Sequence, residues 1–151
     1  AVFGAPISEG KNQDAKNALQ AAAEIQIRFK ELNEELEKEQ SHKMGLRIGI
    51  HSGVVLTGSL GNTERLEYAV MGDAVNCASR LESYEKSRQN NLVRVLVSSV
   101  TRENLDDHDK YYIWESWGPL KVKGRSEKLL VYELKDKESE DESASRKTIN
   151  L

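Results

Sequence analysis

Apolar side chains recur every three or four residues from position 11 to about position 40, which is the spacing of one face of an α-helix. In the second half of this segment glutamates fill many of the intervening positions, as is typical of a solvated helix face. The pattern predicts one long amphipathic helix, with an apolar stripe formed by Ala15, Ala18, Leu19, Ala22, Ile25, Phe29, Leu32 and Leu36.

Shorter runs rich in β-forming residues follow, and they predict strands at residues 46–56, 66–71, 92–97, 110–117 and 129–134. Gly49 and Gly53 interrupt the first run and indicate close approach of another backbone. Helices are predicted at 74–88 and 100–105, a flexible loop at 57–62 and a lysine-bearing turn at 118–124. This irregular alternation predicts an α+β fold in which helices cover one face of a sheet.

The two ends of the chain depart from this pattern. Residues 1–6 look like the end of a strand that enters a turn, and we take this abrupt opening as a sign of N-terminal truncation. Residues 135–151 are polar and acidic, with almost nothing to bury, and are predicted to form a disordered tail. One domain is therefore expected over residues 1–134.

Charge and cysteine content exclude several classes of protein. The formal net charge of −3 argues against a nucleic-acid-binding protein, which needs a basic surface. Cys77 is the sole cysteine, so an internal disulfide is impossible and a reducing compartment is the simplest expectation. No apolar run approaches the roughly 20 residues that span a bilayer.

The predicted helix at 74–88 carries the candidate chemistry. Asn76 and Arg80 are four residues apart and point away from the apolar side formed by Ala74, Ala78 and Leu81. Arginine offers a planar fork of donors suited to phosphate, and an asparagine amide can orient a hydroxyl. Most such pairs are ordinary solvated helix surface, so the pair alone does not establish a site.

The sequence around this pair resembles the catalytic domain of class III adenylyl and guanylyl cyclases, and the resemblance covers residues 1–134. The matching segments are residues 3–6 (FGAP), 46–53 (LRIGIHSG), 70–82 (VMGDAVNCASRLE), 118–124 (GPLKVKG) and 131–134 (VYEL). Their combined order and spacing are more specific than any one of them.

The resemblance implies a ferredoxin-like α+β domain with an antiparallel-rich sheet, whose first strand and helices would precede Ala1. It also implies a head-to-tail homodimer in which the ribose 3′-hydroxyl of ATP or GTP attacks the α-phosphate and pyrophosphate leaves. Two divalent metal ions, Mg²⁺ or Mn²⁺, would activate the hydroxyl and clamp the phosphates. The two metal-binding aspartates of the family would also precede Ala1, so no metal ligand is expected here and the chain alone is expected to be inactive.

Carried over residue by residue, the resemblance gives Asn76 the task of orienting the ribose and Arg80 that of stabilising charge on the α-phosphate. Lys123 would bind the terminal phosphates, with Lys121 a weaker candidate. Asp73 is interpreted as a turn and cap residue rather than a metal ligand.

Base choice is expected to depend in part on Ala69, seven residues before Asn76. Adenylyl cyclases usually carry a polar Asp or Thr at this position, which meets the amino group of adenine. Alanine offers no such hydrogen bond, which indicates either a slight preference for GTP or selection of the base by other contacts.

Two single residues have structural interpretations. His51, in a predicted strand, is expected to be structural, and Cys77 to be a small packing residue.

The sequence leaves three classes of function to distinguish. A cyclase that serves intracellular signalling as part of a larger protein is favoured by the intact Asn76 and Arg80 pair. The alternative is a non-catalytic relative that only dimerises or binds nucleotide. An unrelated ferredoxin-like binding module would predict none of the motif spacing. The catalytic segment is expected to be cytoplasmic, without nucleic-acid or membrane contact of its own, although the parent protein can carry a membrane anchor.

Overall fold

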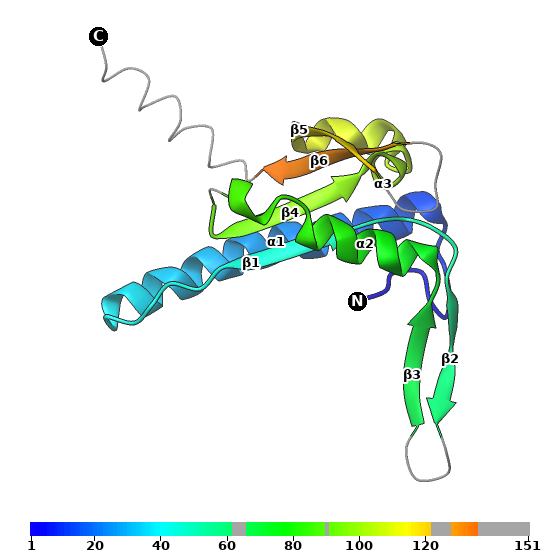
Figure 1. Ribbon diagram of the computed structural model, residues 1–151, viewed down its shortest axis with the longest axis horizontal. Coiled ribbons are helices and arrows are strands. Elements are labelled where there is room, and N and C mark those ends of the chain that lie inside the picture. The colour runs from blue at the N-terminus through cyan, green and yellow to red at the C-terminus, as the bar shows by residue number, and fades with distance from the viewer. Residues whose placement is uncertain (62–65, 90, 122–127, 136–151) are drawn as a thin grey trace.

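A computed structural model describes residues 1–61, 66–89, 91–121 and 128–135 of the chain (Figure 1). The helices are α1 (Lys11–Lys38), α2 (Asp73–Ser83), α3 (Ser99–Glu103) and the 3₁₀ turns η1 (Lys86–Arg88) and η2 (Asp106–Tyr111). The strands are β1 (Leu46–Ile50), β2 (Leu56–Gly61), β3 (Leu66–Met71), β4 (Val93–Ser98), β5 (Ile113–Leu120) and β6 (Leu129–Lys135).

Four strands form the main sheet in the order β1-β4-β6-β5. The β1–β4 pair is parallel, whereas β4–β6 and β6–β5 are antiparallel. β2 and β3 form a separate antiparallel hairpin that extends away from the rest of the chain (Figure 1). The predicted α+β class with an antiparallel-rich sheet is confirmed.

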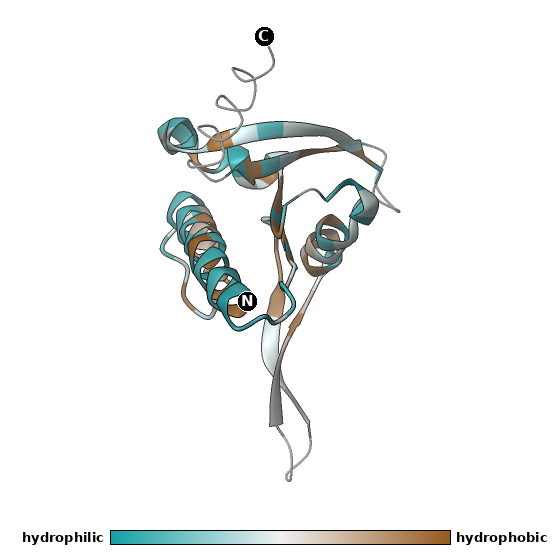
Figure 2. Cartoon of the chain, turned by 90° about the vertical axis from the view of Figure 1, so that its left-hand side faces the viewer, coloured by the Kyte–Doolittle hydropathy of each residue, from teal (hydrophilic) through white to brown (hydrophobic). Residues whose placement is uncertain are grey.

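Helices cover both faces of the main sheet, which corrects the expectation of helices on one face (Figure 2). Val95 and Val97 of β4 share a buried cluster with Leu19 of α1. Leu96 lies between them in sequence and packs with Leu81 of α2. Because successive strand residues point to opposite faces, an uninterrupted apolar run such as 95–97 requires cover on both sides.

Gly49 of β1 lies against the backbone of α2, as the sequence predicted. A Cβ placed on Gly49 would clash with the carbonyl oxygen of Ala78 and would lie 2.5 Å from the backbone nitrogen of Glu82. At Gly53 the corresponding atom would lie 2.8 Å from the Cβ of Ala74. Gly49 therefore allows α2 to approach β1, and Gly53 allows it to approach the segment after β1, more closely than any other residue would permit.

Several boundaries differ from the sequence-based expectation. The predicted strand 46–56 divides into β1 and β2, and the predicted loop at 57–62 is β2 as far as Gly61. Residues 1–10 contain no strand, in contrast to the expected strand end at 1–6. The predicted helix 74–88 ends at Ser83, because Tyr84 is extended and Glu85 is left-handed with φ 39°, and η1 follows.

The predicted turn at 118–124 is also partly strand, because β5 continues to Leu120. A β-bulge between Ser116 and Gly118 accommodates this segment, in which Gly118 has φ 85°. β5 lies at the end of the strand order, where a proline such as Pro119 is tolerated. At the other boundary, Lys135 is the last residue of β6, and the remainder of the expected tail, 136–151, lies outside the described residues.

Candidate functional site

Helix α2 presents one buried and one open side. Its buried residues, Ala74, Cys77 and Leu81, are three and four positions apart and face the sheet. Cys77 has no exposed surface and packs with Leu129, which agrees with its expected packing role. Gly72, with φ 148°, joins β3 directly to the first residue of α2.

Asn76 and Arg80 lie outside the buried stripe of α2, four residues apart. Asn76 is exposed and Arg80 is half-buried. Within the described part of the chain, neither side chain has a hydrogen bond or ion pair. The structure thus holds an amide and a guanidinium one helical turn apart on a fixed helix, with their donors open to a ligand.

Ala69 lies on β3, the strand that leads into α2. It pairs with Gly58 of β2 and is half-buried. Lys121 is exposed and directly follows β5. Lys123 lies outside the described residues, so its predicted meeting with Asn76 and Arg80 stays a prediction.

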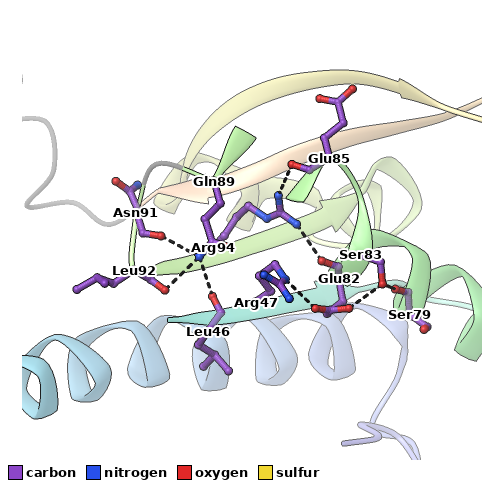
Figure 3. Close-up of polar contacts among 10 residues, drawn as sticks. All are labelled: Leu46, Arg47, Ser79, Glu82, Ser83, Glu85, Gln89, Asn91, Leu92 and Arg94. Carbon is purple, nitrogen blue, oxygen red and sulfur yellow. Dashed lines mark hydrogen bonds and ion pairs between the residues drawn. The ribbon is translucent and has the colours of Figure 1, made fainter. Parts of the chain in front are cut away.

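The C-terminal end of α2 is anchored by two arginines that sequence reasoning missed (Figure 3). Arg94 of β4 is 1% exposed and donates hydrogen bonds to the carbonyl oxygens of Glu82 and Glu85, at 2.8 and 3.0 Å. Arg47 of β1 donates from Nε to the carboxylate of Glu82 at 2.9 Å. Hydrogen bonds from Ser83 and Arg47 lower the pKa of Glu82, whereas burial lowers the pKa of Arg94.

His51 belongs to a buried capping arrangement. Its Nδ1 lies 2.8 Å from the hydroxyl of Ser98, which in turn accepts a hydrogen bond from the backbone nitrogen of Thr101 at 3.3 Å. Ser98 is the N-cap of α3. These contacts support the structural interpretation of His51.

The described residues do not fit a two-metal site. They contain no cluster of three or more His, Cys, Asp or Glu side chains suited to a metal ion. Asp73 is exposed at the start of α2 and accepts a hydrogen bond from the thiol of Cys77 at 3.8 Å. No step through a metal can therefore be derived from these residues.

Comparison with known proteins gives the family. A family model described as the adenylate and guanylate cyclase catalytic domain matches residues 1–136. The chain belongs to this family. The cyclase domain is 34% identical over 134 residues to adenylate cyclase 1 of Rhizobium meliloti (strain 1021), covering 89% of this chain and 19% of that protein. It is 37% identical over 123 residues to an adenylate cyclase of Anabaena cylindrica, covering 78% of this chain and 24% of that one.

Solved structures agree with this membership. The adenylyl cyclase CyaB from P. aeruginosa superposes on the cyclase domain with a TM-score of 0.73 and 28% identity, covering 89% of this chain and 65% of that one. The guanylyl cyclase Cya2 superposes with a TM-score of 0.67 and 26% identity, covering 89% and 63%. The chain thus spans less than two thirds of each of these relatives. No helix in its described residues has the length and apolar character needed to cross a membrane.

Proposed function

We propose that the protein converts a nucleoside triphosphate, ATP or GTP, into the cyclic nucleotide and pyrophosphate. The observation that carries the proposal is the open Asn76 and Arg80 pair on α2, within a chain that belongs to the cyclase family. The packing of α2 presents both side chains outward, where a nucleotide can reach them.

The proposed roles follow from the chemistry of each side chain. The guanidinium of Arg80 binds the α-phosphate and stabilises the charge that develops as the new bond forms. The amide of Asn76 holds the ribose so that the 3′-hydroxyl is directed at that phosphate. Lys123 contributes a positive charge to the terminal phosphates, which leave as pyrophosphate.

We further propose that the active unit is a head-to-tail pair of cyclase domains. In this arrangement the Asn76 and Arg80 face of one domain meets the metal-binding aspartates of the other. When bound, two divalent metal ions supply activation of the hydroxyl and neutralisation of the phosphates. The described residues hold no carboxylate cluster suited to these ions, so in this proposal other residues of the protein bind them.

The alternative is a cyclase-like module that dimerises or binds nucleotide without catalysis. Such a module has no need of an amide and a guanidinium that are held one turn apart and lack hydrogen-bond or ion-pair partners among the described residues. The openness of Asn76 and Arg80 therefore favours the enzyme.

The test is an assay of the full-length protein with ATP or GTP and either Mg²⁺ or Mn²⁺, with the cyclic product separated by chromatography. Arg80→Ala is expected to lower kcat by roughly 100-fold or more with little change in KM, since the group acts mainly in the transition state. Arg28→Ala is the matched control, because Arg28 is a well-exposed arginine of α1 that pairs with Glu31. Absence of cyclic product from the unmodified protein, or an unchanged kcat in Arg80→Ala, would contradict the proposal.

A further inference from the structure

Two arginines lie side by side on the face of the sheet that carries α2. Arg47 of β1 and Arg94 of β4 are register partners in the parallel β1–β4 pair. Gly49 and Leu96, the next residues on the same face, contact α2. Both arginine side chains extend from the sheet to the last turn of α2, where they meet the same residue, Glu82 (Figure 3).

Arg94 caps the C-terminal end of α2 from the side of the sheet. Backbone carbonyls in the last turn of an α-helix lack partners within the helix, and they form the negative end of its dipole. Two of the guanidinium nitrogens of Arg94 donate to the carbonyl oxygens of Glu82 and Glu85, and the guanidinium lies 5.1 Å from the ring centre of Trp117. The buried cation is thus held by main-chain oxygens and an aromatic face.

The two acceptor carbonyls lie on either side of the point where the backbone leaves the helical conformation. Glu82 is still helical, Tyr84 is extended, and Glu85 has the left-handed φ of 39°. A single planar guanidinium bridges the end of the helix and the segment that follows it, because it donates to both carbonyl oxygens at once. Lysine cannot reproduce the contact, because its ammonium is a single point at the end of a flexible stem.

Arg47 holds the same turn through a side chain rather than through the main chain. Its Nε binds one carboxylate oxygen of Glu82, and the other oxygen accepts a hydrogen bond from the hydroxyl of Ser83 at 2.7 Å. Close contact at Gly49 sets the distance between helix and strand. Together these contacts restrict sliding and rotation of α2, whose last turn contains Arg80.

We propose that Arg94, with Arg47 beside it, is a positioning residue that fixes the last turn of α2 so that Arg80 meets the α-phosphate. This inference rests on the proposed catalytic role of Arg80. Neither arginine contacts the substrate in this proposal. They act through the placement of the helix, and a displacement of about 1 Å in a catalytic group can cost about 100-fold in rate.

The test compares Arg94→Lys and Arg47→Met in the full-length protein, each alone and combined with Arg80→Ala. We expect Arg94→Lys to lower kcat by about 10- to 100-fold with KM changed less than about 3-fold, and Arg47→Met to have a smaller effect in the same direction. In the Arg80→Ala background, measured by single-turnover assays with excess enzyme, each substitution should change the rate less than about 2-fold, because the group being positioned is gone.

Arg102→Lys is the matched control. Arg102 is also held through two nitrogens, at 2.8 Å each to Asp109, and it stacks over Tyr132, but it lies on α3. Arg102→Lys should lower the melting temperature and leave kcat unchanged. If Arg94→Lys does not fold, the half-exposed Arg47 supplies the decisive variant, since its substitution leaves the buried carbonyl contacts in place.

Two results would overturn the inference. One is that the substitutions lower only the melting temperature, as in the control. The other is that they lower kcat equally with and without Arg80. Failure of the underlying proposal is distinct, because Arg80→Ala alone would then leave kcat unchanged.

Discussion

Gly49 and Glu82 bring β1 and α2 into direct backbone contact, such that a Cβ on Gly49 would lie 2.5 Å from the nitrogen of Glu82. We expect Gly49→Ala to destabilise the domain by about 1–3 kcal/mol, because either the helix or the strand must move to admit the methyl group. Denaturant unfolding measured at equilibrium tests this expectation.

Gly58→Ala is the control for the glycine prediction. Gly58 also lies in a strand, but a Cβ placed there meets no atom within 4 Å. Its substitution should change the free energy of unfolding by less than about 0.5 kcal/mol. Equal effects of the two substitutions would show that the close contact at Gly49 does not cause the loss of stability.

Glu82 gives the domain a pH-dependent contribution to stability. Its pKa is lowered from 4.5 by hydrogen bonds from Ser83 and Arg47, so the folded state binds the proton less readily than the unfolded state. The contribution is therefore fully present above the unfolded pKa and is lost as the pH falls through the lower, folded pKa.

Glu82→Gln should remove this contribution. The variant is expected to be less stable than the parent at about pH 7, by less than about 1 kcal/mol because solvent screens the partly exposed pair. The difference should shrink on acidification below the unfolded pKa. Urea midpoints measured across the pH range test this, and a difference that is constant down to about pH 3 would count against the assigned cause.

If each active site is formed by residues of two chains, two variants that are inactive alone should regain activity when they are mixed. Full-length protein with Arg80→Ala, mixed with protein that lacks one metal-binding aspartate, should form heterodimers in which one of the two sites is intact. Equimolar mixing with free exchange should restore roughly a quarter of the parental activity. If tagged heterodimers are isolated and remain inactive, each site belongs to one chain.

Ala69 is predicted to discriminate weakly between the purine bases, with a modest preference for GTP. Ala69→Thr should move the ratio of kcat/KM toward ATP, since one new hydrogen bond to adenine contributes about 0.5–1.5 kcal/mol. Val70→Thr is the control, because adjacent residues of β3 face opposite sides. A strong ATP preference in the parent that Ala69→Thr leaves unaltered would mean that this position does not contact the base.

Long periodic segments of the fold were predictable from the sequence. Segments whose structure depends on contacts with distant parts of the chain were not. Helix α1 was predictable because one periodicity repeats over 28 residues, but only part of its predicted stripe is buried. Its buried residues are Ala15, Leu19, Ala22, Gln26 and Asn33, whereas Ile25 and Leu32 are exposed. The segment around Gly58 and Ser59 was assigned to a loop from its small polar residues, but pairing with β3 at six register positions makes it a strand. Strand pairing is a non-local contact, and composition over a few residues does not report it.

The same distinction applies to the candidate site. The relative placement of Asn76 and Arg80 follows from helix geometry alone, so it was predicted. The role of Arg94 depends on carbonyls 12 and 9 residues earlier in the chain, which become neighbours only after folding. The available signal was a charged residue inside the apolar run 92–97, because a buried charge requires partners.

The two tryptophans of the chain lie in different halves of the core although only two residues separate them on β5. Trp114 packs against the cluster that contains Leu19 of α1, whereas Trp117 belongs to the cluster that contains Leu81 of α2. Trp117 also donates a hydrogen bond to Glu133, and the centre of its ring lies 4.2 Å from the guanidinium carbon of Arg88. The domain therefore carries a native fluorophore on each side of its sheet, so that variants retaining a single tryptophan would report separately on loosening beneath α1 and beneath α2.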